Sequence, residues 1–176
     1  MRNTKESASS LANEEVNKGK VGTSRPPVDP DAPFDLDLFV PFLLNRAATR
    51  VAGSFSKTLK DHGLSITTWR LLASLYQHES LRIGELSDFT SIELWTVSRM
   101  VSRLEDDGLL RRERVGGDAR TVNAALTSDG RKLVEALIPK ARDQELGAVS
   151  GFTPEEVGDL QKLLRKIYHN LTPASV

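Results

Sequence analysis

Cysteine is absent from the 176-residue chain. This absence excludes a disulfide framework, a thiol nucleophile and a cysteine metal site. No apolar run approaches the roughly 18 residues that a membrane span needs, and the N-terminus lacks the apolar segment of a secretory signal. We therefore expect a cytoplasmic protein. The apolar fraction of 39% still allows a real core in one ordinary domain.

An excess of charge of one sign is also missing, because 24 basic residues balance 24 acidic ones. A protein that coats nucleic acid without specificity is strongly basic, so the balance argues against that class. It leaves room for a sequence-specific DNA reader with a local basic surface.

Catalytic and cofactor motifs are missing as well. The histidines His62, His78 and His169 are scattered without ligand spacing, and the sequence contains neither a Gly-rich phosphate loop nor a nucleophile elbow. We expect no enzyme activity, no metal and no cofactor. We interpret His62 as a helix cap or as part of a pocket rim.

The chain begins with a polar stretch and then becomes helical. Residues 1–33 carry few apolar side chains and no period, which predicts a flexible tail. Apolar residues then recur at three- and four-residue steps from Leu36 to Leu59, which predicts a long helix. Pro41 predicts a kink or a separate turn near its start, and Gly63 marks its end.

Three shorter helices are expected next. Ser65 is suited to cap the first of them, the second spans about 83–89, and the third spans about 92–107. The third has an apolar stripe at helical spacing and ends at Gly108. A short helix followed closely by a second one is the pattern of a helix-turn-helix.

A β-hairpin is predicted directly after these helices. Two apolar-basic runs, 109–115 and 121–127, flank the string Gly116-Gly117-Asp118-Ala119-Arg120. An arginine at the tip of a projecting hairpin is suited to enter a DNA groove.

Two further helices complete the chain. Thr127 is placed to cap the first, in which Pro139 predicts a kink. Thr153 and Glu156 form a capping box at the start of the second. The expected fold is mainly α with a small β-hairpin wing: a winged helix-turn-helix lobe with a helical lobe built from both ends of the chain.

In a helix-turn-helix the second helix lies in the major groove. Its hydroxyl and guanidinium side chains are candidates for phosphate and base contacts, with Arg99 the best candidate for a guanine. The candidates on this helix are Ser91, Trp95, Thr96, Ser98, Arg99, Ser102 and Arg103, and those on the hairpin are Arg112, Arg114, Asp118 and Arg120. Trp95 either stacks on a sugar or a thymine methyl, or packs inward.

A plainer interpretation is that these residues form the solvated face of an amphipathic helix. Between Arg82 and Arg120 the sequence has seven arginines and eight acidic residues, and Glu105, Asp106 and Asp107 follow one another near the helix end. The local charge alone therefore leaves DNA binding open.

Several motifs together resemble the MarR family of winged helix-turn-helix transcriptional regulators, over about residues 36–171. They are Thr67-Thr68-Trp69-Arg70-Leu71-Leu72, Ile83-Gly84-Glu85-Leu86, Thr96-Val97-Ser98-Arg99, Arg103-Leu104-Glu105-Asp106-Asp107-Gly108-Leu109-Leu110, Asp118-Ala119-Arg120 and Leu126-Thr127-Ser128-Asp129-Gly130.

The resemblance implies a homodimer on a pseudo-palindromic DNA operator. Segments 34–62 and 128–174 would form the dimerisation region, and 63–127 the DNA-binding domain. Arg120 would enter the minor groove, and Asp118 would hold that arginine or the wing backbone. Repression is the commoner outcome in this family.

The start of the expected recognition helix departs from the family pattern. Glu93 and Trp95 stand where small polar residues are common. This departure predicts an atypical operator.

The resemblance also implies a small-molecule effector, held between the dimer helices and the DNA-binding lobe. Asn45, Arg46 and Arg50, with Trp69 and Arg70, are suited to frame an aromatic carboxylate or a phenol. Alternatively, Arg46 and Arg50 form interhelical ion pairs. Two other functions remain open: a winged helix that binds protein instead of DNA, and a DNA-binding regulator that needs no ligand.

Overall fold

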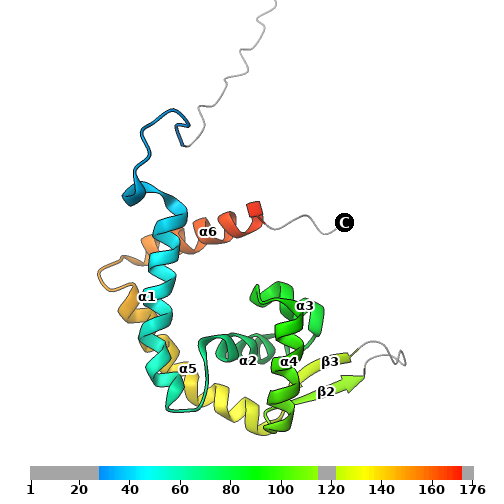
Figure 1. Ribbon diagram of the computed structural model, residues 1–176. Helices are drawn as coiled ribbons and strands as arrows, with labels where there is room; N and C mark the ends of the chain where they lie inside the picture. Colours follow the sequence, from blue (N-terminus) through cyan, green and yellow to red (C-terminus); the bar gives the residue numbers. More distant parts are fainter. Residues whose placement is uncertain (1–27, 115–121, 172–176) are drawn as a thin grey trace, which may run out of the picture. The chain divides into compact units, whose positions relative to one another are not determined.

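The computed structural model describes residues 28–114 and 122–171. Most of the predicted tail and the predicted wing tip, with Asp118 and Arg120, lie outside them. Contacts between residues divide the chain into two units, Met1–Leu36 and Asp37–Val176. The elements from α1 onward belong to the second unit (Figure 1). The described elements are a 3-10 turn at Leu36–Leu38, α1 Val40–Lys60, α2 Ile66–His78, β1 Ser80–Arg82, α3 Ile83–Thr90, α4 Leu94–Asp106, β2 Leu110–Arg114, β3 Val122–Leu126, α5 Ser128–Ala148 and α6 Pro154–Leu171.

The first helix starts at Val40, four residues after the start of the apolar pattern at Leu36. Leu36–Leu38 forms a separate 3-10 turn, and α1 begins at Val40 with Pro41 in its first turn. Proline is tolerated there because its missing N–H has no partner within the helix. The prediction of a separate turn at this point is confirmed.

The helix boundaries around the turn motif follow local caps. Ser65 Oγ accepts the N–H of Thr68 at 3.0 Å, which confirms the predicted cap of α2. Between α3 and α4 the chain turns at Ser91, whose φ of 54° is left-handed. The third helix of this group, α4, begins at Leu94, two residues later than predicted.

The hairpin belongs to a three-stranded antiparallel sheet with the order β1-β3-β2. In the hairpin, Leu110 pairs with Leu126 and Arg114 with Val122. The strand β1, whose Leu81 pairs with Ala124, was not predicted from the sequence. A strand of three residues is too short for alternation to show, and its partner lies more than forty positions away.

The last two helices begin as predicted. Thr127 Oγ1 accepts the N–H of Gly130 at 3.1 Å at the start of α5. Thr153 and Glu156 complete the capping box of α6, with bonds of 3.2 and 2.8 Å. Pro139, where the sequence predicts a kink, does not end α5, which continues through it to Ala148.

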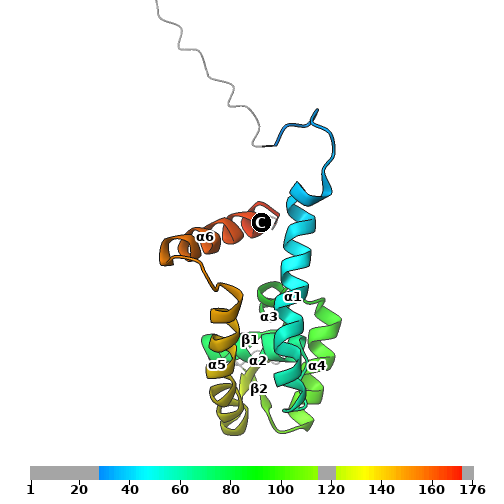
Figure 2. The ribbon, with the colours of Figure 1, turned by 90° about the vertical axis from the view of Figure 1, so that its left-hand side faces the viewer.

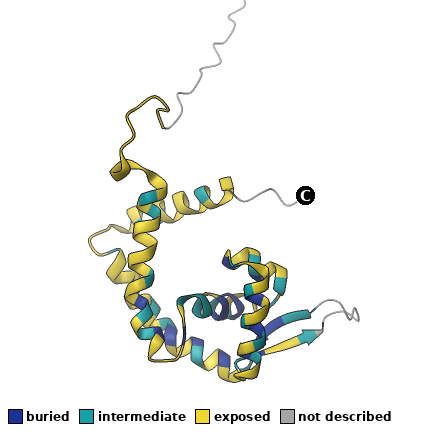
Figure 3. Ribbon diagram, viewed as in Figure 1, coloured by how far each residue is buried: buried dark blue, intermediate teal, exposed yellow. Residues whose placement is uncertain are grey.

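Buried side chains gather where α2, α4, α5 and the sheet meet (Figure 3). Helix α1 adds Phe55 and Leu59 from its C-terminal half, where it lies beside α5 (Figure 2). Helix α6 has no buried residue. Its apolar stripe is therefore left exposed, with Leu160 at 38% and Leu164 at 41%. None of the helices in the described ranges could span a membrane.

Candidate nucleic-acid interface

Helix α4 has one face in the core and one face in solvent. Val97, Val101 and Leu104 are buried, whereas Ser98 and Arg99 on the opposite side are exposed. This amphipathic division follows from apolar residues at three- and four-residue steps. The core contacts thus hold α4 so that its polar face stays accessible.

The start of α4 is held by the main chain and by Ser87. The Ser87 hydroxyl donates to the carbonyl oxygen of Ile92 at 2.6 Å, and the left-handed Ser91 places its N–H near the last carbonyls of α3. Glu93 occupies the N-cap position but makes no capping bond with its side chain. The first N–H groups of α4 therefore have no side-chain cap, which is the arrangement that suits a phosphate oxygen.

Trp95 lies on the exposed side of this first turn. It is 62% exposed, which rules out the inward packing that the sequence left open. The guanidinium of Arg99, one turn later, lies over its ring. A cation–π contact of this kind restricts the guanidinium, and a restricted guanidinium favours bidentate contacts with a base. Thr96, between the two faces, is half-buried.

Two of the predicted DNA contacts bond to each other. Arg112 in β2 donates to Glu105 Oε2 at 2.6 Å and to Ser102 Oγ at 2.7 Å, both on α4. The N–H of Arg112 donates to Glu105 Oε1 at 3.2 Å. Arg103, by contrast, makes only a long 3.8 Å ion pair with Asp107 among the described residues.

Glu105 is not among the functional candidates predicted from the sequence, because its negative charge argues against a DNA contact. Strand alternation could have located its partner. Leu110 and Arg112 share one face of β2, and Leu110 is buried. Arg111, on the other face, bonds to Glu113 at 2.7 Å. Arg114 pairs with Val122 through the main chain, while Asp118 and Arg120 lie outside the described residues.

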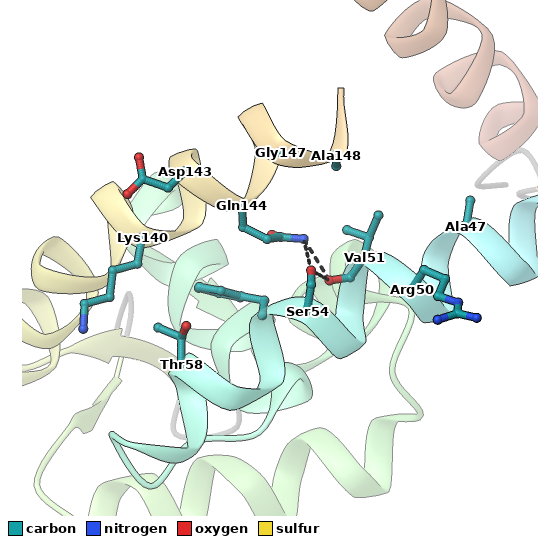
Figure 4. A pocket seen from close by; sticks show the side chains of 11 residues that line it. Ala47, Arg50, Val51, Ser54, Thr58, Lys140, Asp143, Gln144, Gly147 and Ala148 are labelled. Carbon is teal, nitrogen blue, oxygen red and sulfur yellow. Dashed lines mark hydrogen bonds between the residues drawn. The ribbon is translucent and has the colours of Figure 1, made fainter. Parts of the chain in front are cut away.

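The predicted ligand residues are spread over several hollows. Arg50 lines a groove of about 760 Å³ between α1 and α5. Figure 4 shows Gln144 of α5 reaching across this groove to the Val51 carbonyl oxygen, at 2.8 Å, and to Ser54. His62 lines a different hollow of about 510 Å³, beside the C-terminal half of α4.

Trp69 and Arg70 both border two smaller hollows. One, of about 280 Å³, lies between α1, α2 and α5, and the other, of about 380 Å³, lies between α2 and α3. The Trp69 ring packs edge-on against Phe55, with centroids 5.6 Å apart. The structure thus brings Trp69 and Arg70 together but separates them from part of the predicted set.

Asn45 and Arg46 line none of these four hollows. Arg46 lies over the Phe42 ring, 5.2 Å from its centroid, and forms a 3.8 Å ion pair with Asp37. Its charge therefore has a local partner. Across the described ranges, no group of histidine and acidic side chains has the arrangement of a metal site.

Comparisons with known proteins agree with this architecture. A family model described as MarR family matches residues 64–122, which include α2, α3, α4 and β2. The HTH-type transcriptional repressor NicR of Pseudomonas putida is 32% identical over 149 residues, covering 84% of this chain and 93% of that protein.

Two solved structures are similar over most of their length. A MarR family transcriptional regulator from Silicibacter pomeroyi has a TM-score of 0.72 and 32% identity, over 81% of this chain and 96% of that one. BpsR of Bordetella bronchiseptica has a TM-score of 0.67 and 30% identity, over 77% and 98%. From the turn motif, the sheet and these likenesses, the chain belongs to the MarR family of transcriptional regulators.

Proposed function

We propose that the protein is a homodimeric DNA-binding repressor that a small aromatic acid releases from its operator. The observation that carries the proposal is the exposed face of α4. Ser98, Arg99 and Arg103 are exposed on that face, and Arg103 follows Arg99 by one turn. Helix α4 also contacts the wing strand β2. Two such helices in a dimer would meet successive major grooves of a pseudo-palindrome.

The dimer is supported by the apolar side chains at both ends of the described chain. In α1, Val40 is 47% exposed and Leu43 is 43% exposed, and the stripe of α6 is exposed as well. Apolar surface of this extent is usually covered by a partner. A second copy of the same chain offers the matching stripe by two-fold symmetry.

The DNA proposal is tested with fluorescently labelled DNA from the region upstream of the gene. Fluorescence anisotropy should show binding that weakens steeply as salt rises, because each phosphate contact releases counterions. Arg99→Ala should weaken binding and change the sequence preference, whereas Arg120→Ala should weaken binding broadly.

Lys162→Ala is the control for these arginine variants, since it removes one positive charge from the exposed side of α6 opposite its apolar stripe. The DNA proposal fails if Arg99→Ala and Arg120→Ala both bind like the wild type. If DNA binding does not depend on salt and the chain instead binds another protein, the alternative of a winged helix that binds protein is favoured.

For the effector, we infer an aromatic ring with a carboxylate or phenol group. BpsR, the relative from Bordetella, has its DNA binding regulated by 6-hydroxynicotinic acid, which carries a ring, a hydroxyl and a carboxylate. The hollow beside Trp69 offers an aromatic wall and the Arg70 guanidinium. A guanidinium binds a carboxylate through two parallel hydrogen bonds.

Calorimetry tests this inference with 6-hydroxynicotinate, benzoate, salicylate and phenol. At least one compound should bind, and it should release labelled DNA at the same concentrations. If none binds and DNA affinity is unchanged by all four, the effector part of the proposal is wrong, and a ligand-independent regulator remains.

A further inference from the structure

The base of the wing is joined to the recognition helix by one carboxylate. Glu105 on α4 accepts two bonds from Arg112 on β2, one from its main-chain N–H at 3.2 Å and one from its guanidinium at 2.6 Å. The same guanidinium donates to Ser102 Oγ at 2.7 Å. Helix and strand are thus connected by three hydrogen bonds from Arg112, two to Glu105 and one to Ser102.

This pair is better shielded from solvent than the other ion pairs nearby. The side chain of Glu105 is 35% exposed and that of Arg112 is 38% exposed, whereas Arg103 in the pair with Asp107 is 84% exposed. Partial burial and charge-assisted hydrogen bonds make such a pair more rigid than a surface ion pair. The geometry therefore fixes the strand to the helix.

The same bonds occupy the guanidinium that the sequence assigned to DNA. Arg112 directs Nη1 to Glu105 and Nη2 to Ser102, so both terminal nitrogens already have acceptors. An arginine committed in this way adds little positive charge at the surface, because the carboxylate beside it cancels most of its field.

We propose that Glu105 is a positioning residue for DNA binding, which acts by holding Arg112 and with it the wing strand β2 against the recognition helix. The inference rests on the proposed DNA-binding function. It assigns a supporting role to an acidic residue that, judged by its charge alone, should repel the DNA phosphates.

The direction in which one substitution changes the DNA affinity separates this positioning role from simple charge repulsion. Removing a negative charge near a polyanion should tighten binding. Asp106→Ala, at the next position, provides that reference, because Asp106 is exposed and forms no ion pair within the described residues. Glu105→Ala changes the charge equally but breaks the connection, so it should weaken binding about three- to tenfold.

A double-mutant cycle measures the connection directly. Arg112→Ala should weaken binding by a similar factor, and Glu105→Ala combined with Arg112→Ala should bind no worse than the weaker single variant. The slope of log K against log salt should stay unchanged in Arg112→Ala. A phosphate contact at Arg112 would instead reduce that slope by about 0.9.

Circular dichroism checks that each variant folds, and amide hydrogen exchange in the free protein provides a second measurement. Amide hydrogen exchange at Arg112 should accelerate in Glu105→Ala and stay at the wild-type rate in Asp106→Ala, because only the first loses the acceptor of that N–H. The conservative variant Glu105→Gln keeps an acceptor oxygen and should recover part of the affinity.

The outcomes are distinct. If the wild type binds DNA and Glu105→Ala binds it as tightly as Asp106→Ala does, the positioning role is overturned. The proposed function then remains intact. A reduced salt slope in Arg112→Ala makes Arg112 a phosphate contact and also overturns it. Failure of the wild type to bind any DNA overturns the proposed function, and the positioning role with it.

Discussion

The guanidinium of Arg99 lies over the indole ring of Trp95, with Cζ 5.7 Å from the ring centroid. Both residues stand on the exposed face of the recognition helix, one turn apart. A guanidinium held over an aromatic ring loses less conformational freedom when it binds a base. The bulky residue that departs from the family pattern therefore lies within cation–π distance of the best base-reading candidate.

Replacing Trp95 by alanine should weaken operator binding about three- to tenfold, since an exposed cation–π contact contributes about 0.5–1 kcal/mol and more once DNA excludes water. Discrimination between G·C and other pairs under Arg99 should also relax. Anisotropy titrations with the operator and its single-base variants measure both effects.

Trp95→Phe keeps an aromatic face and should retain most of the discrimination. If Trp95→Ala discriminates bases as the wild type does, stacking does not position Arg99. A thymine-to-uracil exchange in the operator, which removes only a methyl group, further tests whether Trp95 itself touches a thymine methyl.

Local signals in the sequence were sufficient for the helices and their caps. Ser65, Thr127 and Thr153 were each identified as caps from residue type and from the helical period that follows. These signals lie within a few residues of one another, so no tertiary information is needed to find them. The hairpin strands were likewise predicted from their flanking runs.

Features that depend on distant partners were missed or only partly resolved. The strand β1 exists because its main chain bonds to β3. The bond between Glu105 and Arg112 requires the helix and the strand to meet at a fixed angle. Arg50 and Arg70 are on different helices and line different hollows, which no periodicity reveals.

At Gly130, close packing against the backbone decides which residue type fits. A Cβ on Gly130 would clash with the carbonyl oxygen of Leu109, and that oxygen accepts the N–H of Thr127 at 3.0 Å. Gly130→Ala must therefore displace the backbone where α5 meets the sheet, and should lower the free energy of unfolding by about 1–3 kcal/mol.

Gly53→Ala is the matched control, because a Cβ at Gly53 in α1 meets nothing within 4 Å. It should raise the free energy of unfolding by about 0.5–1 kcal/mol, as expected for glycine to alanine in a helix. Urea unfolding at one fixed protein concentration measures both. Equal stability of the two variants would show that the junction at Leu109 yields without cost.

The exposed apolar stripe of α6 predicts that the protein forms a dimer. Leu164→Glu places a charge in the middle of that stripe, and a charge without a partner is unfavourable in an apolar interface. The variant should elute as a monomer at concentrations where the wild type is a dimer, as measured by size-exclusion chromatography with light scattering. Its DNA affinity should fall with it.

Lys162→Gln is the control for charge, because it also lowers the net charge by one unit but lies on the opposite side of α6, where Lys162 pairs with Asp159 at 3.0 Å. It should remain dimeric. A dimeric Leu164→Glu variant would remove α6 from the proposed interface.

The two arginines that line different hollows distinguish where an effector binds. Arg70 borders the hollow that Trp69 also lines, whereas Arg50 lines the adjoining groove between α1 and α5. The two share Val51, Phe55 and Gln144. With 6-hydroxynicotinate as the titrant, Arg70→Ala should weaken binding about tenfold or more, since a charge-assisted hydrogen bond contributes about 1.5–3 kcal/mol. Arg50→Ala removes the same charge and should bind like the wild type. The reverse result would place the carboxylate in the α1–α5 groove, where Lys140 would be its second cation.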